Sequence, residues 1–111
     1  MALSETAPHL GLSPAVIDRL RATFAKYPAI EKVLVFGSRA QGIHRPGSDI
    51  DLAVVAPSLS GREFAQLWGE IDDLPIAFKM DLIHFDALEN AEMRQHILRH
   101  GRVLYSSRER Q

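Results

Sequence analysis

The sequence predicts a small α/β (α+β) domain in which helices flank a mixed β-sheet. Three segments carry apolar residues at helical spacing, and three shorter apolar runs of strand length alternate with them. The resulting order is helix, strand, strand, helix, strand, helix (α-β-β-α-β-α), with short connections that are typical of a layered domain. A chain of 111 residues has about the length of one domain. We therefore expect a single domain over residues 1–111, with flexible ends at 1–12 and 106–111.

The first half of the chain predicts one helix and two strands. Ser13 and Pro14 are residues typical of a helix start, and the helix should end just before Pro28, which disfavours helical conformation in the preceding residue. Residues 33–36 and 49–55 are short and mostly apolar, with many β-branched side chains, so they predict buried strands. The segment between these strands is rich in glycine and predicts a loop.

The second half predicts another helix and strand. Ser60 and Glu63 form a capping-box pattern at a helix start. The apolar face of this helix is interpreted as core rather than as a cofactor contact. That face consists of Phe64, Leu67, Trp68 and Ile71. The strand is predicted at residues 80–85.

The last predicted helix begins at a second capping-box pattern, Asp86 with Glu89. Gly101 is a suitable residue for its C-terminal end. Residues 103–105 predict a short additional strand at an edge of the sheet.

Composition excludes several classes of protein. The sequence has no cysteine, which removes disulfide frameworks, thiolate zinc sites and cysteine nucleophiles. The formal net charge is −1, so no overall basic field attracts nucleic acid, and the chain alone is not expected to bind it directly. No apolar run reaches the roughly 20 residues that span a membrane. Residues 1–10 lack the pattern of a signal peptide, so the expected location is the cytoplasm.

Two carboxylates at the start of the second predicted strand are the first candidate functional residues. Asp49 and Asp51 are two positions apart, so they point to the same face of a strand, about 6–7 Å apart. Ile50 and Leu52 should face the core instead. Two such carboxylates repel each other unless a cation lies between them, and ligand sets made only of oxygen suit Mg²⁺ or Mn²⁺. Asp81, in an otherwise apolar strand, is the third candidate ligand.

The loop before Asp49 predicts a phosphate-binding turn. Gly37 lies where a buried strand ends, and a glycine there lets the backbone approach a phosphate closely. Ser38 adds a hydroxyl donor and Arg39 a positive charge. Together with Ser48 at the far end of the loop, these residues are the candidate nucleotide-binding residues. A phosphate-binding turn joined to an acidic pair is what a metal–NTP complex requires.

These motifs resemble those of the nucleotidyltransferase superfamily of DNA polymerase beta, and within it the minimal (MNT-type) members. The signature is Gly-Ser, ten residues, then Asp-x-Asp, with a third Asp on a later strand. Here Gly37-Ser38 is followed by ten residues (39–48) and by Asp49-Ile50-Asp51, and Asp81 has the position of the third carboxylate. The resemblance is strongest over residues 33–85 and extends to the C-terminal part. One departure is Gln41, where many relatives carry Lys or Arg; it puts some phosphate affinity in doubt but not the chemistry.

The resemblance implies a nucleotidyltransferase fold and a metal-dependent transfer of an NMP, typically AMP from ATP, to an acceptor hydroxyl. Asp49, Asp51 and Asp81 would act as catalytic residues and hold two Mg²⁺ or Mn²⁺ ions, with Asp81 nearer the acceptor. Gly37 and Ser38 would hold the terminal phosphates. Minimal relatives work with a small helical HEPN-type protein, which implies such a partner here and, in a toxin–antitoxin pair, AMPylation of that partner. A homo-oligomer is compatible with the sequence.

Alternative interpretations stay open at this point. The chain could be a non-catalytic NTP–metal binding subunit or an antitoxin that acts by occluding a helical partner. A sugar-nucleotide glycosyltransferase, which also uses Asp-x-Asp, is disfavoured by the short chain. On the third predicted helix, Glu92, His96 and His100 have the spacing of metal ligands, but we interpret them as a solvated face. His84 alternates with Asp81 along its strand and is expected to face away from the metals.

Overall fold

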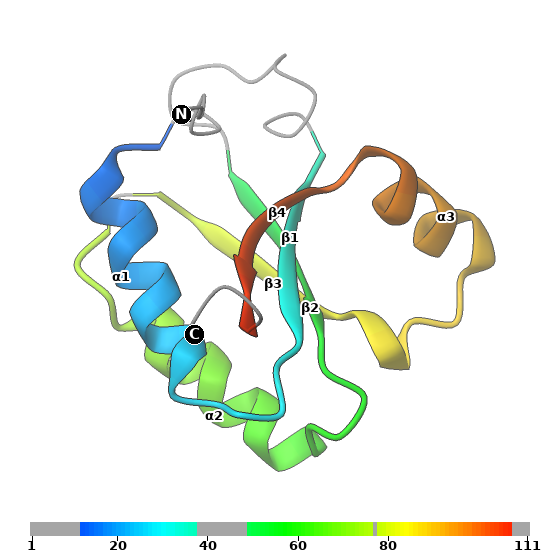
Figure 1. Cartoon of the computed structure of the whole chain (residues 1–111), viewed down its shortest axis with the longest axis horizontal. Coiled ribbons are helices and arrows are strands. Elements are labelled where there is room, and N and C mark those ends of the chain that lie inside the picture. The colour runs from blue at the N-terminus through cyan, green and yellow to red at the C-terminus, as the bar shows by residue number, and fades with distance from the viewer. Residues whose placement is uncertain (1–11, 38–48, 77, 108–111) are drawn as a thin grey trace.

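The computed structural model describes residues 12–37, 49–76 and 78–107. The predicted order of elements is confirmed, and the additional C-terminal strand is present as well (Figure 1). In chain order, the regular elements are α1 (Pro14–Ala25), β1 (Lys32–Phe36), β2 (Ile50–Val55), α2 (Gly61–Asp72), β3 (Met80–His84), the 3₁₀ turn η3 (Phe85–Ala87), α3 (Ala91–His100) and β4 (Arg102–Ser106). Among these described helices, none is long and apolar enough to cross a membrane.

The four strands form one mixed sheet in the order β3-β2-β1-β4. β1 is antiparallel to both of its neighbours, β2 and β4, whereas β2 and β3 are parallel. Parallel neighbours need a crossover connection, and α2 supplies it between β2 and β3. β3 and β4 are the two edges, which agrees with the edge position predicted for residues 103–105.

The sheet has a hydrophobic core on each face. Figure 1 shows α1 and α2 on one side of the strands and α3 on the other. Side chains alternate between the faces along each strand, so one set packs against α1 and α2 and the other against α3. The larger core, on the α1–α2 face, includes Leu20, Phe24, Val33, Val35, Ile50, Leu52, Val54, Leu67, Ile71 and Leu82. The smaller core, on the α3 face, consists of Leu34, Phe36, Ala53, Val55, Phe85 and Ile97.

The first helix starts as predicted. The Ser13 hydroxyl accepts a hydrogen bond from the Val16 amide, and Pro14 occupies the first turn, where no amide hydrogen is needed. α1 ends at Ala25, a little earlier than Pro28 alone would require. The chain then enters turns that lead to β1.

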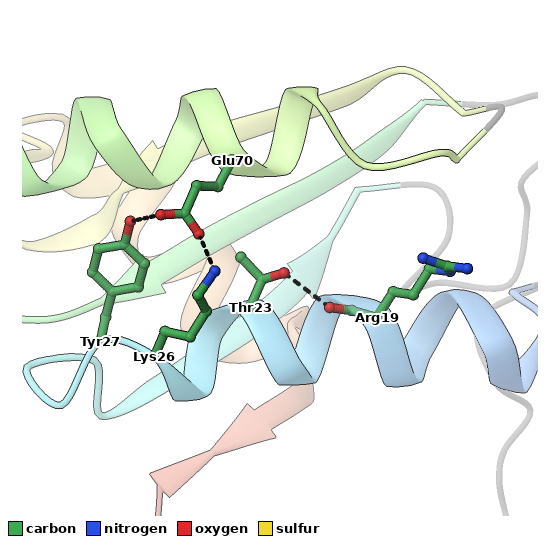
Figure 2. Close-up of polar contacts among 5 residues, drawn as sticks. All are labelled: Arg19, Thr23, Lys26, Tyr27 and Glu70. Atoms are coloured by element: carbon green, nitrogen blue, oxygen red, sulfur yellow. Dashed lines mark hydrogen bonds and ion pairs between the residues drawn. The ribbon is translucent and has the colours of Figure 1, made fainter.

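A small polar cluster ties the end of α1 to α2 (Figure 2). The Tyr27 hydroxyl donates to Glu70 Oε2 at 2.7 Å, and Lys26 Nζ lies 2.9 Å from Glu70 Oε1. Burial raises the pKa of Tyr27 to about 12, with a further contribution from the hydrogen bond to Glu70. The hydrogen bonds from Lys26 and Tyr27 lower the pKa of Glu70. The cluster links the two helices that cover the same face of the sheet.

The predicted capping box at the start of α2 is confirmed. The Glu63 amide donates to the Ser60 hydroxyl at 3.1 Å, and the Ser60 amide donates to the Glu63 carboxylate at 3.0 Å. Leu67 and Ile71 are fully buried. Trp68 is not: it is 37% exposed, so its assignment to the core was wrong, although its ring edge contacts Phe64.

The predicted start of the last helix was wrong. α3 begins at Ala91, and its cap is Asn90, whose side chain accepts from the Met93 amide at 3.0 Å. Asp86 lies instead in η3, where its carboxylate accepts a hydrogen bond from the Ala56 amide at 2.7 Å. The spacing of Asp86 and Glu89 predicted a helix cap, but the Asp86 carboxylate instead binds the amide of Ala56, which is distant in sequence.

α3 ends at His100, and Gly101 follows it at the C-terminal end of the helix, as predicted. The φ of Gly101 is −67°, so no left-handed conformation requires a glycine there. Packing requires it. A Cβ at this position would lie 2.5 Å from the Ile97 carbonyl oxygen and 3.3 Å from Leu34 Cβ. Beyond Gly101 the chain enters β4, where the Leu104 carbonyl accepts a hydrogen bond from Arg21 Nε at 2.8 Å.

Candidate active site

Two of the three predicted aspartates occupy paired positions in the sheet. Asp51 on β2 is the register partner of Asp81 on the parallel strand β3, and of Phe36 on the antiparallel strand β1. Paired residues share a face, and Phe36 belongs to the core on the α3 face. Asp51 and Asp81 therefore lie on the α3 face, near the ends where β2 and β3 begin. Asp51 is partly buried and Asp81 is exposed.

The charge of Asp51 is disfavoured by its surroundings. Burial raises the pKa of its carboxyl group, and the negative charges of Asp81 and Asp49 raise it further. Asp49, which is exposed, lies one residue before β2 rather than within it. Asp81 pairs with Asp51 across the strands and Asp49 acts on it by its charge, so negative charge accumulates at this end of the sheet.

Gly37 adjoins this group of carboxylates. It follows the last residue of β1 and has a φ of +78°, a conformation that glycine adopts without strain. A Cβ on Gly37 would lie 2.8 Å from Asp51 Oδ2. The structure thus brings the glycine of the predicted phosphate-binding turn directly beside a predicted metal ligand.

The remaining predicted nucleotide-binding residues cannot be placed against the aspartates. Ser38, Arg39 and Ser48 lie outside the described residues, as does Gln41. Their proposed contacts with a nucleotide remain predictions from sequence.

The donor chemistry of the aspartates suits a hard divalent cation. All three side chains offer carboxylate oxygen, the ligand that Mg²⁺ and Mn²⁺ prefer. The pKa of Asp51 is raised by burial first and then by the negative charges of Asp81 and Asp49. Their arrangement is not a closed cage, because no three His, Cys, Asp or Glu side chains in residues 12–37, 49–76 and 78–107 are grouped so as to hold a metal ion. The residues therefore fit an ion by their chemistry, without a ready-made coordination shell.

The residues expected to face away from the aspartates do so. Ile50 and Leu52 are completely buried in the core on the α1–α2 face. His84 also lies on that face: its ring stacks on Phe64 with the centroids 5.1 Å apart, and its Nε2 is 3.1 Å from the Ala56 carbonyl oxygen. The alternation of side chains along β3 thus separates His84 from Asp81.

The histidines of α3 form no metal site within the part of the chain that the structure describes. The rings of His96 and His100 are neighbours, with centroids 4.9 Å apart, and no three-ligand set includes them. An open pocket on this helix is lined by residues of α3 only, and none of the three aspartates contributes to it. The residues that line it are Ala91, Glu92, Gln95, His96 and Arg99.

One charged residue near the aspartates received no role from the sequence. Lys79 is exposed and immediately precedes β3, and its carbonyl oxygen accepts a hydrogen bond from the Ile50 amide at 2.9 Å. Its backbone consequently lies beside the start of β2, next to Asp49. In the sequence, Lys79 is notable only for its position two residues before Asp81. Its closeness to Asp49 becomes visible only once β2 and β3 are known to be neighbours.

Comparison with known families gives a clear match. The family model described as polymerase beta, nucleotidyltransferase matches residues 18–110, which contain the three aspartates and Gly37. No curated protein resembles the chain closely enough to count as a match.

Several solved structures share the fold. A chain in the crystal structure of a toxin–antitoxin pair with AMP-PNP is 23% identical, with a TM-score of 0.66 over 88% of this chain and 77% of that one. A chain in the complex of tri-AMPylated Shewanella oneidensis HEPN toxin with MNT antitoxin is 18% identical, with a TM-score of 0.62 over 86% and 73%. A nucleotidyltransferase candidate from Sulfolobus solfataricus is 17% identical, with a TM-score of 0.52 over 89% and 94%. These likenesses establish the architecture of the sheet and its helices.

Proposed function

The chain belongs to the polymerase beta nucleotidyltransferase family, and we propose that it transfers AMP from ATP to an acceptor hydroxyl. The observation that carries this proposal is the pairing of Asp51 with Asp81 on adjacent strands, with Gly37 against the Asp51 carboxylate. In the reaction, the acceptor oxygen forms a bond to the α-phosphorus of ATP. The bond from that phosphorus to the bridging oxygen breaks, and pyrophosphate leaves.

Asp49, Asp51 and Asp81 are the proposed ligands of two Mg²⁺ or Mn²⁺ ions. When bound, divalent ions stabilise the charge on both the entering and the leaving oxygen of an in-line displacement. The uncompensated charge around Asp51 supports this assignment, because a cation would relieve it. Asp81, the more exposed member of the pair, can also accept the proton that the acceptor hydroxyl loses.

The triphosphate is assigned to the turn after β1. Gly37, with its positive φ, lies at the end of β1 beside Asp51. We assign Ser38, Arg39 and Ser48 to the phosphates on their sequence positions. Lys79 is a further cation close to the start of β2 that can compensate phosphate charge.

The proposed acceptor is a hydroxyl group on a helical HEPN-type partner protein. The support is architectural: chains of similar fold occur in a toxin–antitoxin structure with AMP-PNP and in a complex that contains an AMPylated HEPN toxin. On this proposal the chain acts as the antitoxin of such a pair and modifies its toxin.

The test uses the protein encoded beside this chain as acceptor. Wild-type chain, ATP and Mg²⁺ should label that partner when the ³²P is on the α-phosphate, and should not label it when the ³²P is on the γ-phosphate. The double variant Asp49→Ala/Asp51→Ala should bind the partner in pull-down but leave it unlabelled. Glu92→Gln, which removes an exposed carboxylate on α3, is the matched control and should label like the wild type.

Equal labelling by the wild type and the double variant, including none by either, would refute the enzymatic proposal if both bind the partner. That outcome would favour the alternative, an antitoxin that acts by occlusion. Label from the γ-phosphate would indicate phosphoryl transfer instead.

A further inference from the structure

The close approach of Gly37 and Asp51 has two separate physical components. The first is the φ of +78° at Gly37, which disfavours any residue with a Cβ. The second is space, because a Cβ on Gly37 would lie 2.8 Å from Asp51 Oδ2, 3.7 Å from Cγ and 3.9 Å from Cβ. A carbon and an oxygen that share no bond do not approach to 2.8 Å, so one of the two groups would have to move.

The backbone of Asp51 is held on both sides. Phe36 pairs with it from β1 and Asp81 from β3, and its neighbours Ile50 and Leu52 are completely buried. Moving this backbone would disturb the centre of the sheet. The carboxylate at the end of the side chain is therefore the group that yields when a Cβ is added to Gly37. We expect such a substitution to displace the Asp51 carboxylate rather than the strand that carries it.

We propose that Gly37 is a positioning residue for Asp51: the missing side chain keeps open the space that the Asp51 carboxylate occupies against the end of β1. This role differs from close approach to a phosphate, because it concerns the Asp51 carboxylate rather than a ligand. It rests on the proposed function only for the consequence that a displaced Asp51 binds metal poorly. The steric relationship itself is independent of any ligand.

The experiment measures Mn²⁺ binding without nucleotide, by electron paramagnetic resonance, together with thermal unfolding and a crystal structure of the variant. Gly37→Ala should weaken Mn²⁺ binding about 10- to 100-fold, the range typical when a residue that orients a metal ligand is lost. The Tm should fall by only a few degrees, because rotation of the Asp51 carboxylate relieves the close contact and the strain of the positive φ is what remains. The crystal structure should show the Asp51 carboxylate rotated away from the added methyl group. Gly69→Ala, a glycine with open space around its Cβ position, is the matched control and should bind Mn²⁺ like the wild type.

A double-mutant cycle separates this role from others. In an Asp51→Ala background, Gly37→Ala should cause no further loss of Mn²⁺ affinity, because the displaced carboxylate is already absent. Additive losses, or an Asp51 side chain that stays in place in the variant structure, would overturn the proposal. A Gly37→Ala variant that loses only ATP affinity and keeps its Mn²⁺ affinity would also overturn it, and would assign the glycine to phosphate binding.

The outcomes also distinguish this inference from the proposed function. If the wild type binds no Mn²⁺, the metal-dependent function fails, and the position of Asp51 in the variant structure still decides the role of Gly37. If the wild type binds Mn²⁺ and transfers AMP but Asp51 does not move, the positioning role alone fails.

Discussion

Asp51 and Asp81 are paired residues on parallel neighbouring strands, so two like charges face each other near one end of the sheet. Like charges at paired positions destabilise a sheet, and here burial of Asp51 adds to the effect. A sheet optimised for stability alone would not keep this arrangement. The pair therefore costs stability at this end of the sheet, which agrees with the proposal that a cation binds there.

The first prediction concerns the stability of the metal-free protein. The pKa of Asp51 is raised in the folded state, so the folded protein binds this proton more tightly than the unfolded chain. The resulting stabilisation is complete below the ordinary pKa of 3.8 and is lost as the pH rises through the raised value. Asp51→Asn should thus have a higher Tm than the wild type near pH 7, and the difference should shrink as the pH falls towards about 4.

Thermal unfolding in a chelating buffer across this pH range measures the effect. Mg²⁺ should narrow the difference at neutral pH, because an ion that binds only the folded wild type raises its Tm. A difference that stays constant with pH would show that the charge of Asp51 is not its cause.

The second prediction concerns turnover. Asp81→Asn should lower kcat for AMP transfer by roughly 10²- to 10⁴-fold, the usual contribution of a group that accepts a proton in the reaction. The KM for ATP should change little, since the triphosphate is assigned to the turn after β1. Steady-state kinetics with the partner as acceptor provide both numbers. A variant whose KM rises while its kcat is preserved would assign Asp81 to nucleotide binding.

The third prediction concerns the cluster that joins α1 to α2. The pKa of Glu70 is lowered, so its contribution to stability is present above the unfolded value of 4.5 and disappears as the pH falls through the lower folded value. Tyr27→Phe and Glu70→Gln should each lower the Tm slightly at neutral pH, because contacts at such an exposed carboxylate are worth little. The Glu70→Gln difference should vanish in acid. Chemical or thermal unfolding at both pH values tests this, and a Glu70→Gln variant that is equally impaired at low pH would contradict it.

The fourth prediction tests the assignment of Asp86. Its carboxylate accepts from the Ala56 amide at 2.7 Å in a partly buried setting. Asp86→Ala leaves that amide without its partner and should destabilise the protein by about 1–3 kcal/mol in urea unfolding. Glu89→Ala is the control: it should change stability by less than about 0.5 kcal/mol, because Glu89 is exposed and caps no helix. If both variants lose a comparable free energy of unfolding, the result would instead support the capping box that the spacing of Asp86 and Glu89 predicts.

The fifth prediction tests Gly101, where α3 turns into β4. Its φ of −67° would accept alanine, but the added Cβ would lie 2.5 Å from the Ile97 carbonyl oxygen. Because that oxygen belongs to the helix backbone, Gly101→Ala should cost about 1–3 kcal/mol through overpacking. Gly69→Ala, in the exposed middle of α2, should instead stabilise by up to about 1 kcal/mol. Unfolding of both variants in urea distinguishes a packing role at Gly101 from a purely conformational one.

Local chemistry in the sequence was sufficient for most of the fold. Helix starts were readable because a capping side chain binds an amide only a few residues further along the chain, as at Ser13 and Ser60. Asp86 failed as a signal because its partner, Ala56, is thirty residues away. The order of the strands was equally out of reach, since it depends on which strands pair and not on the composition of any one of them.

The candidate site likewise has features that the sequence predicts and features that depend on how the strands pair. The spacing of Gly37, Asp49 and Asp51 is readable in the sequence, and so is the acidic residue at position 81. The partnership of Asp51 with Asp81, and the reason why position 37 has no room for a side chain, depend on three strands lying side by side. The position of Lys79 beside the start of β2 also depends on the pairing of the strands.

The hydrogen bond from Arg21 to the Leu104 carbonyl brings a charged side chain to one edge of the sheet. β4 is an edge strand, and exposed edges invite a foreign strand to extend the sheet. The Arg21 guanidinium occupies the Leu104 carbonyl, and Arg102 adds an exposed positive charge to the same strand. Charged side chains at a sheet edge oppose pairing with a strand of another chain. We therefore expect the loss of Arg21 to increase aggregation of the protein, as measured by light scattering.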